Sequence, residues 1–304
     1  MAGKEASIHS GNSNQAGKRI ELTLIRDLAY ASQSEAQKLD VYMPSQAAGS
    51  RPVILWIHPG GFCEGDKGGN SNMALARVNM LELVLPMLER GYSVVSTNYR
   101  FSQEAIFPAL IFDVKAAVRW IRANAAQYHF NPDKIAAWGS SSGGYLAAML
   151  ATTGGVKELE DLSMGNADQS SRVVAAVDWY GPTDFLMMDP HHLEIGQEAH
   201  VHEASSHESL LMGAPLLTIV EKCKTATPMT YVSKDSTPIY ITQGKGDPTI
   251  PYPQSITLAE KMAAAIGKEH VVLTLVEKVG HADEVFFKLD HINKVIDFLD
   301  KYMK

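Results

Sequence analysis

The stretch Gly139-Ser140-Ser141-Ser142-Gly143 decides the predicted fold of this chain. It follows the apolar run Lys134–Trp138 and leads into a second apolar segment with the pattern of a helix. A strand, a sharp turn bounded by glycines and a helix are the context of a nucleophile elbow, which holds a serine hydroxyl above the edge of a sheet. The glycines let the strand and helix backbones approach each other without a clash.

Among the three serines, the positions of the glycines favour Ser141. It alone has a glycine two residues before it and another two residues after it, whereas Ser140 and Ser142 each lack one of them. Ser142 instead offers the backbone N–H that follows the nucleophile. Taken alone, the stretch is equally consistent with a flexible loop or a phosphate-binding turn, so the interpretation depends on its partners.

A serine hydroxyl needs a base, and the base needs an orienting carboxylate. In elbow proteins these groups follow the serine in the order acid, then histidine. Asp247 comes just after the strand-like run Pro238–Gln243, and His281 comes shortly after the run Val271–Val276. Because ligands bind at the carboxyl ends of parallel strands, we expect both groups to meet Ser141 at one edge of the sheet.

Other histidines and carboxylates fit less well. His270 precedes its strand and would lie at the opposite edge, and His291 lies within the last helical pattern. Asp283 and Glu284 follow the candidate histidine and break the expected order. The alternatives are that Asp247 is a turn-forming residue before proline and that the candidate histidine is an ordinary loop residue.

A glycine loop lies upstream, in the stretch His58-Pro59-Gly60-Gly61-Phe62 after the apolar run 53–57. Acyl transfer builds negative charge on the carbonyl oxygen, and a preorganised backbone donor to that oxygen contributes about 3–4 kcal/mol. We expect the N–H groups of Gly60, Gly61 and Ser142 to serve as these donors. His58 is expected to hold the loop in shape, and an ordinary glycine turn is the alternative.

With these motifs, the chain resembles an α/β-hydrolase of the esterase and lipase kind with an HGGG-type oxyanion loop. It is similar to carboxylesterases of the feruloyl and acetylxylan esterase type (BD-FAE-like), from Leu39 to the C-terminus. Two positions depart from the family pattern: Pro59 replaces the first glycine of the triplet, and Ser142 replaces a common alanine. Proline has no N–H to donate, but the two following glycines remain, and Ser142 keeps its backbone N–H. The other segments that carry the resemblance are 39–44, 98–102, 107–109, 113–120, 131–135, 180–184 and 205–209.

The predicted fold class is α/β: an α/β-hydrolase fold in one domain, 1–304. Alternating strand and helix patterns favour a mostly parallel sheet of about eight strands with helices on both faces and an antiparallel edge formed by the first two strands. Strand-like runs occur at 20–26, 38–42, 53–58, 92–98, 134–138, 173–179, 238–243 and 271–276, and helical patterns at 110–124, 255–266 and 291–302. The resemblance implies that segment 185–227 is a cap inserted over the site.

The resemblance also suggests substrate contacts in this cap and near the two glycine motifs. The predicted contacts are Phe62, Tyr145, Met187, Met188 and Leu211, with core packing as the alternative for the cap residues. The cap is rich in histidine, and the spacing of His200 and His202 is compatible with zinc. We favour surface histidines over a metal site, because no third ligand is implied.

Composition agrees with a globular enzyme. The chain has 304 residues, 45% of them hydrophobic, and a net charge of −7 without a basic cluster, which disfavours nucleic acid as a partner. Cys63 and Cys223 have no metal-type spacing and indicate no disulfide framework, and no stretch is apolar enough to span a bilayer. Met1–Lys18 lacks the apolar core of a signal peptide, so the expected location is the cytoplasm, or outside the cell if a leader was removed.

The sequence therefore predicts a serine carboxylesterase that requires no cofactor and acts on a small-molecule or polymer-linked ester. Its oligomeric state is left open. An amidase, formamidase or peptidase-like hydrolase with the same triad is the first alternative. A non-catalytic binding protein on the same fold is the second, although such proteins normally lack one of the three groups.

Overall fold

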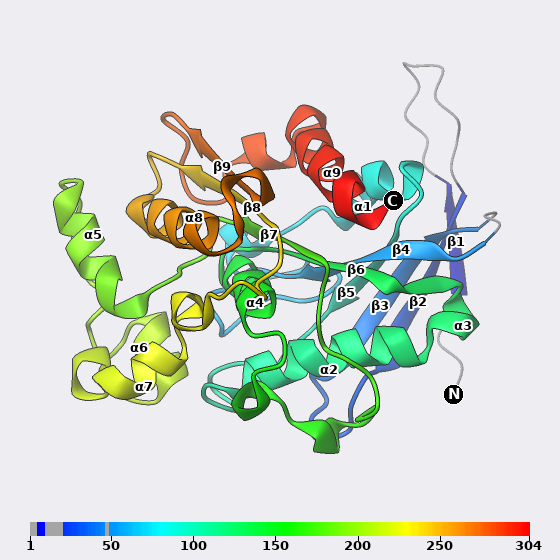
Figure 1. Ribbon diagram of the computed structural model, residues 1–304, viewed down its shortest axis with the longest axis horizontal. Coiled ribbons are helices and arrows are strands. Elements are labelled where there is room, and N and C mark those ends of the chain that lie inside the picture. The colour runs from blue at the N-terminus through cyan, green and yellow to red at the C-terminus, as the bar shows by residue number, and fades with distance from the viewer. Residues whose placement is uncertain (1–4, 10–20, 46–48) are drawn as a thin grey trace.

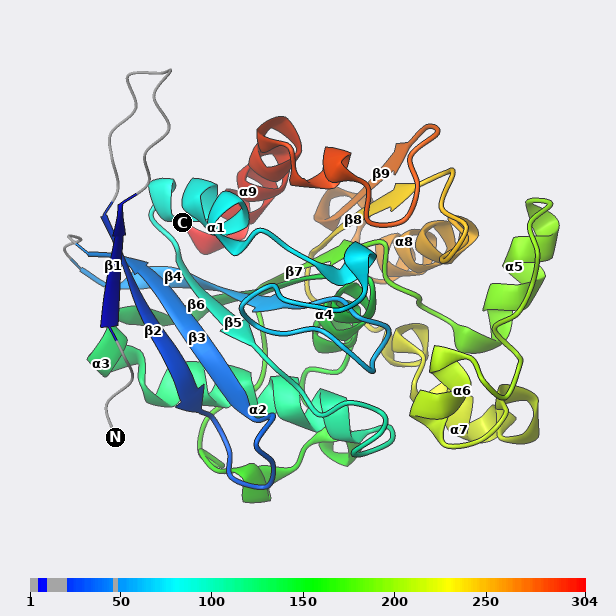
Figure 2. The same cartoon turned by 180° about the vertical axis from the view of Figure 1, so that it is seen from behind.

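The computed structural model describes residues 5–9, 21–45 and 49–304, and in these residues the strands form one sheet of nine. The strand order is β1-β2-β3-β5-β4-β6-β7-β8-β9. Strands β1, β2, β3 and β5 pair antiparallel with their neighbours in that series, and the remaining pairs, from β5–β4 to β8–β9, are parallel. Figures 1 and 2 show the twisted sheet running through the molecule. The strands are β1 Glu5–His9, β2 Glu21–Ala29, β3 Lys38–Pro44, β4 Arg51–Ile57, β5 Ser93–Thr97, β6 Phe130–Ser140, β7 Ala175–Trp179, β8 Ile239–Gly244 and β9 Val271–Val276.

Helices cover both faces of the sheet, so the strands β5, β7 and β8 are buried at every position. On one face, α2 (Ala109–Ala123), α4 (Ser142–Thr152) and α8 (Pro253–Ile266) pack against the sheet. On the other face lie α1 (Met80–Glu89) and α9 (Leu289–Met303). The remaining helices are α3 Ala125–Tyr128, α5 Met188–Glu194, α6 His207–Met212 and α7 Val220–Thr225, and short 3-10 turns lie at Ala74–Ala76, Lys157–Leu159, Leu162–Met164, Phe185–Met187, Leu216–Thr218, Pro228–Tyr231, Lys268–His270 and Glu284–Phe287.

This architecture confirms the predicted mostly parallel sheet with helices on both faces. The first two predicted strands do pair antiparallel, as β2 and β3, although Ile20, the expected start of β2, lies outside the described residues. The described sheet has nine strands rather than about eight because β1 adds an edge strand in a segment that carries no clear strand pattern. Strand β6 also begins earlier than expected, at Phe130, which pairs with Arg51 of β4.

The segment Phe185–Thr227, called the cap segment below, contains α5, α6 and α7 and lies at the end of the molecule nearest α8 (Figures 1 and 2). Its apolar side chains join the core on the α2 and α4 face, since Leu211 and Leu216 are fully buried there. The segment also reaches the loop after β8, because the Gln197 side chain donates a hydrogen bond to the backbone carbonyl of Asp247 over 3.0 Å.

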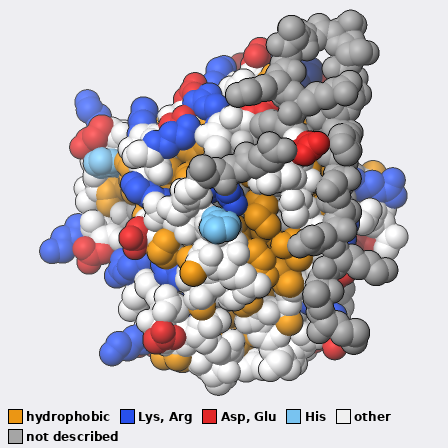
Figure 3. Space-filling view, turned by 90° about the vertical axis from the view of Figure 1, so that its right-hand side faces the viewer, with side chains coloured by type: hydrophobic (Ala, Val, Ile, Leu, Met, Phe, Trp, Pro, Cys, Tyr) orange, Lys and Arg blue, Asp and Glu red, His pale blue; other side chains and the backbone are white. Residues whose placement is uncertain are grey.

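None of the helices in the described residues combines the length and apolar character needed to cross a bilayer. The view of the β1 side of the molecule (Figure 3) shows acidic and basic side chains intermixed on the described part of that face. This agrees with the moderate negative net charge of −7.

Candidate active site

Ser141 lies at the turn between β6 and α4, in a backbone conformation that side chains rarely adopt (φ 53°, ψ −123°). The flanking glycines make this turn sterically feasible. A Cβ atom at Gly139 would overlap the carbonyl of Gly143, and one at Gly143 would overlap the carbonyl of Ile57 in β4. The turn is fixed further by the Ser141 N–H, which donates to the carbonyl of Trp179 over 2.8 Å. Strained backbone of this kind is typical of functional sites.

The structure brings Ser141, His281 and Asp247 together in a single chain of hydrogen bonds. His281 Nδ1 lies 2.7 Å from Asp247 Oδ2, and His281 Nε2 lies 3.0 Å from Ser141 Oγ. An ionised carboxylate has no proton to donate and can only accept hydrogen bonds, so the proton on His281 Nδ1 points at Asp247. Nε2 is then free to accept the proton of the Ser141 hydroxyl, which is the arrangement required for general-base catalysis.

Four donors hold the Asp247 carboxylate, which is 1% exposed. Oδ1 accepts the backbone N–H groups of Thr249 and Ile250, at 2.8 and 2.9 Å. Oδ2 accepts the side-chain amide of Gln243 at 2.9 Å in addition to His281. A buried charge is tolerable when it is fully hydrogen-bonded, and these bonds fix the carboxylate in one orientation.

Three residues that the sequence analysis missed support the candidate site. Gln243 donates to Asp247, Tyr180 packs its ring edge-on against His281 at 5.0 Å between centroids, and Gln197 ties the cap segment to the Asp247 loop. The available signal was position: Gln243 and Tyr180 each lie at the carboxyl end of a strand, at the sheet edge that carries ligands. Gln197 carried no such signal, because its contact is made 50 residues away along the chain.

The glycine loop after β4 has the backbone conformation expected of an oxyanion loop. Gly60 and Gly61 adopt φ values of 134° and 58°, and Phe62 also has a positive φ. In the described chain, no backbone carbonyl accepts the N–H groups of Gly60, Gly61 or Ser142. The backbone hydrogen bonding is therefore compatible with the predicted role of these groups as donors to an oxyanion.

His58 and Tyr99 connect this loop to the elbow. The Tyr99 hydroxyl lies 3.2 Å from the His58 carbonyl and 3.1 Å from Ser142 Oγ, and the two rings stack at 4.5 Å. His58 Nδ1 donates to the carbonyl of Pro59 over 2.8 Å. Burial lowers the pKa of His58 from 6.5 to about 4, so the ring is neutral near pH 7. These contacts agree with the expected role of His58 in loop shape.

Of the five predicted substrate contacts, Met187 alone is exposed, at 40%. Phe62 and Tyr145 are buried and pack edge-on against each other at 5.5 Å, and Phe185 joins them. Met188 and Leu211 are buried in the core on the α2 and α4 face. In this structure these four side chains pack against protein neighbours, and their role as substrate contacts stays a prediction.

His200 and His202, the pair whose spacing is compatible with zinc, have protein partners. His200 lies between Glu198 and Glu203, and His202 donates from Nε2 to the carbonyl of Leu186 and lies 3.3 Å from Asp189. Within the described ranges, no three His, Cys, Asp or Glu side chains are grouped as metal ligands. Cys63 and Cys223 are both free thiols.

Known proteins share this architecture. A truncated carbohydrate esterase from gut microbiota has a structure with a TM-score of 0.80 and 31% sequence identity, covering 92% of this chain and 96% of that chain. The propionate-bound esterase Est2 of Thermogutta terrifontis, at 20% identity, 90% and 93% coverage and a TM-score of 0.68, shows the α/β-hydrolase fold.

Two sequence relatives come from Mycobacterium tuberculosis. The probable carboxylic ester hydrolase LipM is 27% identical over 84% of this chain and 55% of its own length. Esterase LipQ is 29% identical over 75% of this chain and 50% of its own length. The chain thus spans about half the length of these curated relatives. A sequence profile described as BD-FAE matches residues 39–262. The chain belongs to the BD-FAE family, on the α/β-hydrolase fold.

Proposed function

We propose that this protein is a serine carboxylesterase. Ser141 attacks the ester carbonyl while His281 removes its proton at Nε2, and Asp247 stabilises the imidazolium that forms. The N–H groups of Gly60, Gly61 and Ser142 bind the oxyanion of the tetrahedral intermediate. His281 then protonates the leaving alcohol. In the second half of the reaction, water attacks the acyl-enzyme while His281 removes its proton, and His281 returns that proton to Ser141 Oγ as the acid product leaves. The mechanism requires no cofactor.

The observation that carries the proposal is the hydrogen-bond chain of 3.0 and 2.7 Å through Ser141, His281 and Asp247. It lies beside a glycine loop whose N–H groups have no backbone acceptor in the described residues. Membership of the BD-FAE family and the esterase names of its relatives support the same chemistry.

For the substrate, we propose a carboxylic ester of a small molecule or of a polymer. The similarity to a carbohydrate esterase at 31% identity supports an ester whose alcohol part bears hydroxyl groups. We further propose that the cap segment shapes this choice, since it contacts the Asp247 loop through Gln197.

Initial rates on p-nitrophenyl acetate and butyrate, with matched p-nitroanilides, test the proposal. We expect turnover of the esters, at least about 100-fold slower turnover of the anilides, and a loss of about 10⁴-fold or more in Ser141→Ala. Ser140→Ala is the matched control, and it should retain ester turnover. Anilides cleaved faster than esters would favour an amidase instead, and no turnover of either class would favour a binding protein.

A further inference from the structure

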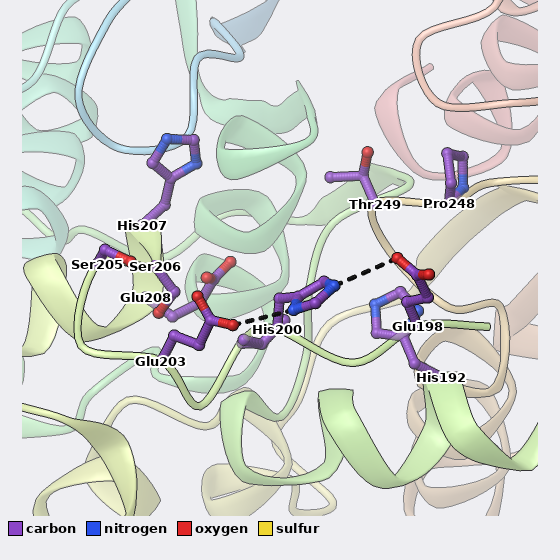
Figure 4. Close-up of a pocket in the computed structure, with 11 residues that line it drawn as sticks. His192, Glu198, His200, Glu203, Ser205, Ser206, His207, Glu208, Pro248 and Thr249 are labelled. Carbon is purple, nitrogen blue, oxygen red and sulfur yellow. Dashed lines mark hydrogen bonds and ion pairs between the residues drawn. The ribbon is translucent and has the colours of Figure 1, made fainter.

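A cavity of about 410 Å³ lies between the cap segment and the Asp247 loop (Figure 4). On one wall are Pro248 and Thr249, which directly follow Asp247. On the opposite wall is His207, close enough to the oxyanion loop that a Cβ atom at Gly61 would come within 2.6 Å of its Nδ1. The cavity therefore adjoins both the loop that orients His281 and the loop that would hold the oxyanion.

The lining of this cavity is acidic, and in the described chain it includes neither lysine nor arginine. Its ionisable residues are His192, Glu198, His200, Glu203, His207 and Glu208. At the exposed rim, His200 pairs with both Glu198 and Glu203, at 3.4 and 3.0 Å. These two carboxylates therefore have a partner in the protein, and water screens their charge.

Glu208 differs from the rim carboxylates because it is 8% exposed, and its carboxyl group is hydrogen-bonded by its own backbone N–H. Among residues 5–9, 21–45 and 49–304, no other residue's side chain or backbone group hydrogen-bonds or ion-pairs with its carboxyl group. Burial raises the pKa of Glu208 to about 7, and the nearby charge of Asp189 acts in the same direction. Glu208 lines the cavity, and a carboxylate with a single hydrogen bond keeps lone pairs that can accept further hydrogen bonds from a ligand there.

The side of the cavity indicates which half of the ester it receives. The leaving alcohol takes its proton from His281 Nε2, so it must lie on the His281 side of Ser141. Pro248 and Thr249 belong to the loop whose carboxylate holds that imidazole. This position favours the alcohol half of the substrate as the occupant of the cavity.

We propose that Glu208 is a specificity-determining residue, which recognises a hydroxyl-bearing or cationic group on the leaving alcohol and disfavours alcohols with a negative charge. This proposal rests on the esterase function proposed above. An ionised carboxylate accepts hydrogen bonds from hydroxyl groups and attracts cations. A like charge brought beside this buried carboxylate is repelled more strongly than at the exposed rim, where water screens the charge.

The test compares acetate esters of alcohols that match in size and differ in charge: glycerol, glycerate and choline. At about pH 8, where most Glu208 is ionised, the wild-type kcat/KM for glyceryl monoacetate should exceed that for acetylglycerate by about 30-fold. In Glu208→Gln, that ratio should shrink by at least about tenfold. Because each ratio is taken within one protein, a general loss of activity or stability cancels.

Glu203→Gln is the matched control, because it removes the same charge from the exposed rim, and it should change the ratio by less than about threefold. The choline ester shows whether Glu208 recognises its ligand by hydrogen bonding or by charge. A higher kcat/KM for the glycerol ester than for the choline ester indicates hydrogen bonding, and a higher kcat/KM for the choline ester indicates charge. A matched acyl pair, p-nitrophenyl butyrate and p-nitrophenyl hemisuccinate, should respond less to Glu208→Gln than the alcohol series does.

A wild-type ratio near one, or equal changes in Glu208→Gln and Glu203→Gln, would overturn the proposal. A larger effect in the acyl series would overturn the assignment of the cavity to the alcohol. Each of these results leaves ester hydrolysis by Ser141 intact, whereas failure of the proposed function would appear as no hydrolysis of any of the esters.

Discussion

At the scale of single residues, the candidate site depends on side chains that neighbouring groups hold in one orientation. His281 is held by Asp247 on one side and by the ring of Tyr180 on another. Asp247 is held in turn by two backbone N–H groups and by Gln243. The hydrogen bond to Asp247 fixes the imidazole tautomer that leaves Nε2 to accept a proton, and the other contacts hold Asp247 and the ring in place, so removal of any one should lower kcat.

Replacement of Asp247 by asparagine tests this arrangement. The amide keeps the shape of the carboxyl group but cannot stabilise the imidazolium or enforce the Nδ1–H tautomer, so kcat should fall by about 10³-fold or more. Asp283→Asn is the control, since Asp283 caps the following turn through the Val285 N–H and should be near wild type. The reverse result would make Asp283 the orienting acid.

At the scale of structural elements, the elbow depends on the close approach of β6, α4 and β4. Gly139 and Gly143 are required because a Cβ atom at either would overlap backbone, which cannot move aside as a side chain can. The Ser141 strain is therefore maintained by the packing of three elements and not by local sequence preference.

Gly143→Ala should reduce the free energy of unfolding by about 3 kcal/mol or more and abolish ester turnover, because the turn must open to admit the methyl group. Gly280→Ala is the matched control: no atom lies within 4 Å of its added Cβ, so the free energy of unfolding should change by less than about 1 kcal/mol. Urea unfolding curves measure both. Equal stability of the two variants would show that the turn is not as tight as described.

The strands and the elbow could be predicted because their signals are local. Apolar runs, glycine spacing and the positions of Asp247 and His281 just after strands follow from pattern and parallel-sheet geometry. The edge strand β1 could not be predicted, because its strand conformation is specified by its pairing with β2. Gln243 and Glu208 were also beyond reach, since polarity alone does not say which side chain meets a distant carboxylate or a cavity.

At the scale of the whole molecule, buried histidines couple folding to pH. Burial lowers the pKa of both His58 and His291 from 6.5 to about 4. Between about pH 4 and 6.5 the unfolded chain thus binds more protons than the folded one, and the free energy of unfolding falls as the pH falls. For the fully buried His58 this amounts to about 3 kcal/mol across the range.

His291→Phe should weaken this acid sensitivity. His291 packs against Trp179 and Phe286, and within the described residues its Nε2 has no hydrogen-bond partner. A phenyl ring fits the apolar surroundings, so stability near pH 7 should be equal or higher, and the fall between about pH 6.5 and pH 4.5 should shrink by about 1 kcal/mol. A pH dependence as steep as that of the wild type would show that His291 is not buried in its neutral form.

The most direct test of the central claim locates the covalent bond to the proposed nucleophile. The wild-type protein and the Ser141→Ala variant are treated with a fluorophosphonate, and the modified residue is identified by peptide mass spectrometry. We expect a single adduct on Ser141 in the wild type, formed at a rate that falls when His281 is replaced by alanine, and no adduct in Ser141→Ala. An adduct on Ser140 or Ser142, or labelling that persists in Ser141→Ala, would contradict it.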